Sequence, residues 1–169
     1  MGNISEYDMY LFGAGVHYDM YMKLGAHPCK KGRWQGVNFA VWAPNAKSVS
    51  VVGEFNDWDR TRNPMTRAEY IGIYTCFVPG VKEGMMYKFC IETITGEYHM
   101  KADPYANYAE LRPGTASRIT NIENLKWTDS SWMAAREKWN HKKEPMSVYE
   151  VHMGSWKRHP GTEDEGFYT

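Results

Sequence analysis

The stretch VNFAVWAPNAKSVSVVGEFNDWD (residues 37–59) decides the fold class. Apolar and polar residues alternate over Val37–Trp42 and again over Ser48–Phe55, which is the pattern of strands that bury one face. Pro44 and Asn45 interrupt the pattern between the two runs, so they predict a turn there.

The same design continues downstream. GIYTCFVPGVKEGMMYKFCIET (residues 72–93) predicts strands at Ile73–Val78 and Met86–Thr93 around a Pro-Gly turn. ITGEYHMK (residues 94–101) adds a tight turn and a shorter strand, and a final strand is expected near Ser117–Thr120. Because helix signals are absent from residues 37 to 100, we predict a mainly β protein, an immunoglobulin-like antiparallel β-sandwich over residues 34–122.

Segments of a different character flank the predicted sandwich. Residues 5–22 carry Tyr and Met at helical spacing around a Gly-rich break, which predicts two short helical turns and then a loop, so that residues 1–33 form a helical and loop segment. Residues 123–145 are expected to form a linker with one helix, capped by Asp129 or Ser130 and ended by Pro145.

Ser147–Met153 follows as a run of β-branched, aromatic and apolar residues between Pro145 and Gly154. Such a run is typical of a strand buried on both faces, as in parallel sheets. It would either add to the edge of an earlier sheet or begin another domain, which we assign to residues 146–169.

Bulk composition excludes several classes of protein. Lysine plus arginine number 20 and the acids 20, so no net field attracts nucleic acid or an anionic membrane. The sequence has neither an apolar run of about 18–20 residues nor a secretion signal. Three cysteines without paired spacing suggest reduced thiols, so we expect a cytoplasmic protein. No metal-ligand spacing or cofactor fingerprint occurs, and we expect neither a metal nor a cofactor.

Aromatic residues in turn-like sequence are the candidate binding residues. Trp58 follows the Asn56-Asp57 turn, where an exposed indole suits the apolar face of a sugar and nearby polar groups such as Asn56 can bind hydroxyls. Lys88 lies on the strand face opposite Tyr87, and Tyr98 follows the next turn. The alternatives are a Trp58 folded back over the end of the sandwich, a solvated strand lysine and a core tyrosine.

Carboxylates are the other candidates for chemistry. Glycoside cleavage needs two of them held about 5–10 Å apart, one with a raised pKa. Glu54, Asp57 and Asp59 cluster in one turn, but they are expected to be solvated, and the acidic stretch Glu163–Glu165 is expected to be flexible. We therefore predict no catalytic residue in this chain.

The sequence resembles a known family. LGAHP, FAVWAPNAKSVSVVGEFNDWD, YKFCI, KADPYA, RPGTAS and SVYEVHMGSWKR together resemble the N-terminal part of bacterial glycogen branching enzymes, from about Tyr10 to Trp156. The pattern around WAPNA and FNDW is shared with starch-binding modules of carbohydrate-binding module family 48.

This resemblance implies a function for the parent enzyme. Such enzymes cleave α-1,4 glucan through a covalent glycosyl-aspartate and transfer the segment to a 6-hydroxyl, without a cofactor. Ser147–Met153 resembles the first strand of their (β/α)₈ catalytic barrel, whose active site needs later strands. The resemblance thus implies a truncated barrel, and we predict that this chain alone does not catalyse branching.

The resemblance also bears on the candidate residues. Trp58 and Lys88 match a glucan-stacking tryptophan and its neighbouring lysine in glycogen-sensing members. Tyr98 stands where those members have a second tryptophan, and Ser117-Arg118 stand where they carry an asparagine.

Three other functional hypotheses remain open from the sequence. They are a free-standing glycan sensor, a module of a debranching or trehalose-releasing enzyme, and a generic immunoglobulin-like interaction domain. The expected partners are α-glucan and the absent catalytic barrel. An uncovered Ser147–Met153 strand also predicts self-association or disorder after about Glu144.

Overall fold

The computed structural model describes residues 4–68, 71–140, 142–152 and 156. The chain divides into two compact units, residues 1–125 and residues 126–169.

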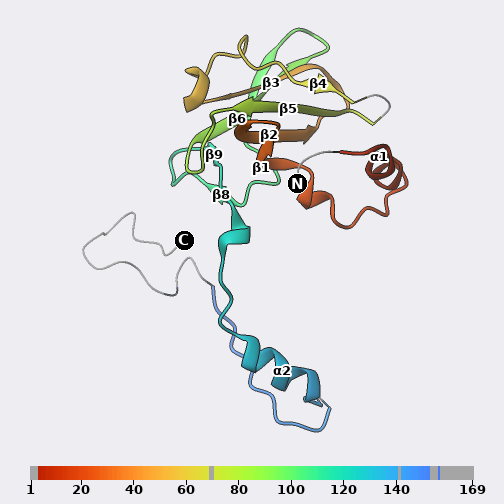
Figure 1. Ribbon diagram of the computed structural model, residues 1–169, viewed down its shortest axis with the longest axis vertical. Coiled ribbons are helices and arrows are strands. Elements are labelled where there is room, and N and C mark those ends of the chain that lie inside the picture. The colour runs from red at the N-terminus through yellow and green to blue at the C-terminus, as the bar shows by residue number, and fades with distance from the viewer. Residues whose placement is uncertain (1–3, 69–70, 141, 153–155, 157–169) are drawn as a thin grey trace, which may run out of the picture. The chain divides into compact units, whose positions relative to one another are not determined.

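Residues 1–125 contain two antiparallel sheets (Figure 1). The first has the order β1-β2-β5-β4 and is built from Gly25–Lys31, Trp34–Trp42, Ile73–Pro79 and Thr66–Arg67. The second has the order β3-β6-β9-β8 and is built from Ala46–Gly53, Met86–Thr93, Ser117–Arg118 and Tyr108–Ala109. Strand β7 (Tyr98–Lys101) also pairs with β6. The predicted mainly β sandwich is confirmed.

The core follows from the alternation of apolar residues along the strands. Phe39 of β2, Val51 of β3 and Phe89 of β6 are all buried, and the Phe39 and Tyr87 rings pack edge to face at 5.2 Å. Full burial of each such side chain contributes about 1.5–3 kcal/mol to folding. Lys88, between Tyr87 and Phe89, therefore points to the outer face of the second sheet.

The strand predictions hold where alternation is regular and fail where it is interrupted. Strand β6 has the predicted bounds, Met86–Thr93. The expectation of a loop after the helical turns is wrong, because residues 25–31 form strand β1 in register with β2. Strand β1 lies at the edge of its sheet, where Pro28 can be accommodated although it lacks an N–H.

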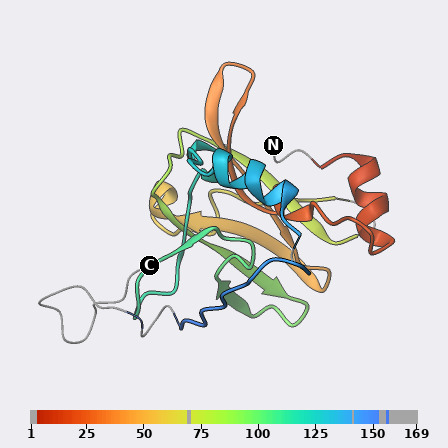
Figure 2. The ribbon, with the colours of Figure 1, turned by 90° about the horizontal axis from the view of Figure 1, so that it is seen from below.

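The N-terminal segment folds as predicted into two helical turns, α1 (Glu6–Gly13) and the 3₁₀ turn η1 (Met20–Met22). Ser5 and Asp8 form a reciprocal capping box at the start of α1. Met20 and Leu24 pack with Ala40 and Ile73 in a small second cluster. Both Figure 1 and Figure 2 draw α1 at one side of the sandwich.

Residues 126–152 contain one helix, α2 (Ser130–Lys138), in the predicted linker. Asp129 precedes it as expected, but its side chain makes no capping hydrogen bond, and the helix ends at Lys138, before Pro145. Within residues 145–152 no strand is formed, so the predicted barrel strand is not confirmed there, and Met153 lies outside the described residues. A strand needs a paired neighbour, and these residues have none among the described strands.

Candidate functional site

The turn that follows β3 positions Trp58. Gly53 ends β3 so close to β6 that a Cβ there would collide with the Met86 carbonyl oxygen. The 3₁₀ turn η2 (Glu54–Asn56) follows, and Asp57 and Trp58 then both adopt positive φ, 56° and 58°. Two successive left-handed residues without glycine are strained, so the surrounding hydrogen bonds must hold them.

Asn56 provides most of that support. Its Oδ1 accepts from the Gly53 N–H at 2.9 Å, and its Nδ2 donates to the Val51 carbonyl at 3.0 Å and to Asn63 Oδ1 at 2.7 Å. Asn56 is only 2% exposed. We predicted it as a sugar contact, but its burial and its internal hydrogen bonds make it a residue that shapes the turn.

The carboxylates of this turn serve its structure. Asp59 accepts from the N–H and hydroxyl of Thr61, both at 2.8 Å, and these bonds lower the pKa of Asp59. Asp57 pairs with Arg62 at 2.9 Å, and Glu54 accepts from the Met86 N–H at 2.7 Å. Hydrogen bonds and an ion pair thus commit all three carboxylates to the turn.

Lys88 lies on the outer face of the second sheet, opposite Val52 of β3. It is half-buried, and its Nζ donates to Thr115 Oγ1 at 2.5 Å. The side chain is therefore held in place, unlike a freely solvated strand lysine. Its remaining N–H groups can donate to a ligand.

Tyr98 lies on the same face. Glu92 is four residues after Lys88 in β6 and therefore points to the same side, and Tyr98 pairs directly with Glu92. The ring is 49% exposed. The Arg60 guanidinium lies over it, with 4.3 Å between the guanidinium carbon and the ring centroid. Arg60 follows Trp58 by two residues, so this contact links the Trp58 turn to β7.

Strand register thus places Lys88 and Tyr98 on the outer face of the second sheet, four positions apart along β6, and Arg60 links the turn that contains Trp58 to Tyr98. Trp58 is half-buried, which leaves part of its indole accessible. Two aromatic rings with a lysine and an arginine beside them can stack on sugar rings and donate to hydroxyls. The sequence prediction missed Arg60 and Thr115, since only the pairing of distant segments gives them a role.

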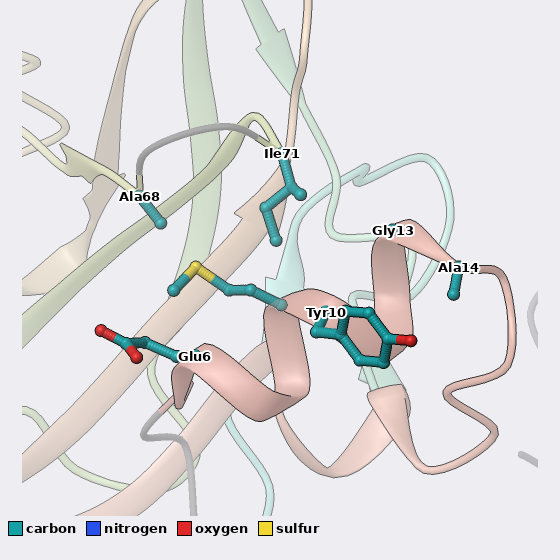
Figure 3. A pocket seen from close by; sticks show the side chains of 7 residues that line it. Glu6, Tyr10, Gly13, Ala14, Ala68 and Ile71 are labelled. Carbon is teal, nitrogen blue, oxygen red and sulfur yellow. The ribbon is translucent and has the colours of Figure 1, made fainter.

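A pocket lies along α1, in the same unit as the sandwich. Its volume is about 780 Å³, and Met9, Ile71 and other apolar side chains line it, with Glu6 and Tyr10 at its sides (Figure 3). It offers a single carboxylate and few polar groups. Its lining therefore suits an apolar group better than a sugar.

Within the part of the chain that the structure describes, no group of three His, Cys, Asp or Glu side chains could hold a metal ion. No helix there is both long and apolar enough to cross a membrane. All three cysteines are free, and burial raises the pKa of Cys76 to about 12.

The family model described as carbohydrate-binding module 48 (isoamylase N-terminal domain) matches residues 23–106. The 1,4-alpha-glucan branching enzyme GlgB of Butyrivibrio fibrisolvens is 52% identical over 166 residues, which cover 98% of this chain and 26% of that enzyme. The GlgB enzyme of Protochlamydia amoebophila is 53% identical over 90% of this chain and 21% of its own length. The chain thus spans about a quarter or less of these relatives.

Solved structures agree on the fold. Pullulanase type I from Bacillus subtilis, complexed with maltose, is 30% identical with a TM-score of 0.51, over 63% of this chain and 14% of that protein. The maltotriose complex of PulA from Klebsiella pneumoniae has a TM-score of 0.50 at 24% identity, over 60% of this chain and 11% of that one. The match to the second protein concerns the fold alone.

Proposed function

The chain belongs to the carbohydrate-binding module 48 family through residues 23–106 and is a homologue of bacterial glycogen branching enzymes, and on that premise we propose that its sandwich binds α-glucan. The observation that carries the proposal is that Lys88 and Tyr98 share the outer face of the second sheet while Arg60, two positions after Trp58, lies over the Tyr98 ring. The site binds and does not cleave, since its carboxylates are committed to the turn.

Trp58 is the principal stacking residue of the proposed site. Lys88 donates to hydroxyls of the bound chain, and Tyr98 supports a neighbouring sugar ring. Asn56 acts indirectly, because it holds the turn that presents Trp58.

Native gel electrophoresis with and without glycogen in the gel tests this proposal. The unaltered chain is expected to be retarded by glycogen, and Trp58→Ala is expected to lose the retardation. Trp34→Ala is the matched control, since Trp34 is an exposed tryptophan on β2, in the other sheet. Equal retardation of the unaltered chain and Trp58→Ala would refute the site. Loss of retardation in the Trp34 control would move it to another surface.

The whole enzyme, by its relationship to the GlgB proteins, makes α-1,6 branches by transferring α-1,4-glucan segments. Residues 1–169 contribute glucan binding and a docking surface for a catalytic barrel. We assign no catalytic residue within it. An assay of branching with residues 1–169 alone is expected to give no activity above background.

A second partner is proposed for residues 126–152, which expose Trp127, Val148 and Tyr149 to 76%, 79% and 73%. Several large apolar side chains left exposed in one segment are typical of an interaction surface. The catalytic barrel is the occupant in the whole enzyme, and in its absence two copies of the chain associate through these residues. Sedimentation velocity is expected to give the mass of a dimer for residues 1–169 and the mass of a monomer for residues 1–125.

The cytoplasm is the proposed location. Three free cysteines support it, one of them buried and two half-buried, since thiols persist in a reducing compartment. Fractionation of cells that make the protein checks the assignment.

A further inference from the structure

Arg60 crosses the outer face of the second sheet. It starts in the turn after β3, on one side of β6, whereas Tyr98 belongs to β7, which pairs with the other side of β6. The guanidinium carbon nonetheless lies 4.3 Å from the Tyr98 ring centroid. The side chain must therefore extend over β6 to reach the ring.

The residues beneath this path are consistent with the crossing. Cys90 belongs to the outer face of β6, because it alternates with the core residue Phe89, yet it is only 2% exposed. Lys47 and Ser48 hold the pKa of Glu92 low, and the nearby charge of Arg60 acts in the same direction. Arg60 also acts on the thiol of Cys90, against the burial that raises its pKa.

This crossing joins the two rings of the proposed glucan site. Only Asp59 separates Arg60 from Trp58, so their Cα atoms are at most about 7 Å apart. The turn itself is fixed by Asn56. Once the guanidinium holds the Tyr98 ring, the separation of Trp58 and Tyr98 is fixed before any ligand binds, which lowers the entropic cost of binding.

We propose that Arg60 is a positioning residue that locks Tyr98 relative to Trp58, so that the site selects α-glucan chains long enough to contact both rings. The inference rests on the proposed glucan binding. It differs from a direct sugar contact by Arg60, because Arg60 then acts only through Tyr98.

The test compares maltose with maltoheptaose by isothermal titration calorimetry. Maltose is short enough to occupy one ring, whereas maltoheptaose can contact both. Arg60→Ala is expected to weaken maltoheptaose binding about fivefold and maltose binding less than about twofold. The thermal midpoint is expected to stay unchanged, since Arg60 is exposed.

A double-mutant cycle separates positioning from contact. Tyr98→Ala is expected to weaken maltoheptaose binding at least as much as Arg60→Ala does, and the double variant is expected to bind no more weakly than Tyr98→Ala, because Arg60 acts only through Tyr98. Arg60→Lys keeps a cation for the ring and is expected to restore most of the affinity. Additive losses would overturn the proposal in favour of a direct contact, and an unchanged or raised affinity in Arg60→Ala would overturn it outright.

Trp58→Ala distinguishes failure of this inference from failure of the proposed function. If Trp58→Ala abolishes binding and Arg60→Ala does not alter it, glucan binding stands and the positioning role falls. If the unaltered chain binds neither sugar, the proposed function itself falls.

Discussion

Tryptophans in two regions of this molecule have opposite surroundings. Trp58 lies in a turn whose bends are fixed by the buried Asn56 and by the Asp59 and Arg62 side chains. Trp132 and Trp139, 57% and 43% exposed, lie in and just after α2, a helix with no buried residue. Exposure of an aromatic ring therefore does not by itself identify a ligand site. A ring that its neighbours hold in place can bind a ligand. A ring on a helix without buried residues is instead a candidate surface for packing against a partner.

The largest difference between the two regions concerns stability. Phe39 is fully buried, so Phe39→Ala is expected to lower the free energy of unfolding by about 3–5 kcal/mol. Trp132→Ala, of similar chemistry, is expected to change it by less than about 0.5 kcal/mol. Chemical denaturation followed by circular dichroism measures both. Comparable losses would break the comparison, because α2 would then be a packed element.

The next effect concerns the scaffold of the Trp58 turn. Asn56→Ala removes three hydrogen bonds and leaves buried partners unsatisfied, which is expected to cost about 2–3 kcal/mol. Glycogen retardation should be lost with it, although the amide is buried. Asn63→Ala, which removes one of the three bonds, is the graded control. Full binding by a folded Asn56→Ala chain would show that Trp58 does not need this turn.

A smaller effect on stability is expected at the N-terminal segment. There Asp8 accepts hydrogen bonds from Ser5 and His17, whereas no carboxylate of α2 is held by such bonds. Burial would raise the pKa of Asp8, but the hydrogen bonds from His17 and Ser5, with help from Lys23, hold that pKa well below the usual range of an aspartate. Asp8→Asn is expected to cost about 1 kcal/mol at neutral pH, after allowance for solvent screening.

The pH dependence of that cost follows from the lowered pKa. A depressed carboxyl pKa stabilises the fold above the unfolded-state value, and the contribution is lost as pH falls toward the folded-state value. The difference between the two chains should therefore be constant above about pH 4 and shrink below it. Urea titrations at several pH values measure it, with Glu6→Gln as the exposed control in the same helix. A difference that grows on acidification would contradict the assignment.

The smallest effect sharpens the comparison at the site itself. Tyr98→Trp enlarges the ring beneath Arg60 and is expected to raise glucan affinity about two- to threefold. Tyr108→Trp is the matched control, because Tyr108 is also an exposed strand tyrosine under an arginine, Arg118 at 5.8 Å. Affinity electrophoresis in glycogen gels ranks the variants. A gain in the Tyr108 variant alone would place the binding face nearer to β8.

The sequence predicted the parts of the fold that regular alternation encodes. Strand β6 is predicted to the residue because Tyr87 and Phe89 alternate cleanly with Lys88 and Cys90. Strand β1 was missed because Gly25 and Pro28 are typical of loops, and only its pairing with β2 stabilises it as an edge strand. The short strands β4 and β8, two residues each, carry no periodicity to detect.

The candidate site was predicted in part for the same reason. Trp58 is conspicuous in a polar turn, and alternation fixes the outward direction of Lys88. Asn56 was expected to bind sugar hydroxyls, but the fold turns its amide inward to hydrogen-bond with three backbone and side-chain partners. The crossing of Arg60 over β6 depends on tertiary structure alone. The apolar run after Pro145 predicted a strand that needs a neighbour absent among the described strands.

Strand β6 pairs with β3 on one side and with β7 and β9 on the other, which has a consequence for amide hydrogen exchange. Its amides, in the middle of the sheet, should exchange only when the whole sandwich opens, whereas the four exposed residues of β7 should exchange through local fraying. Lys88 and Tyr98 thus belong to two strands of one sheet whose amides exchange on different timescales. A glucan chain that bridges them should slow exchange in β7 and leave β6 unchanged, so deuterium uptake would record where the sugar lies.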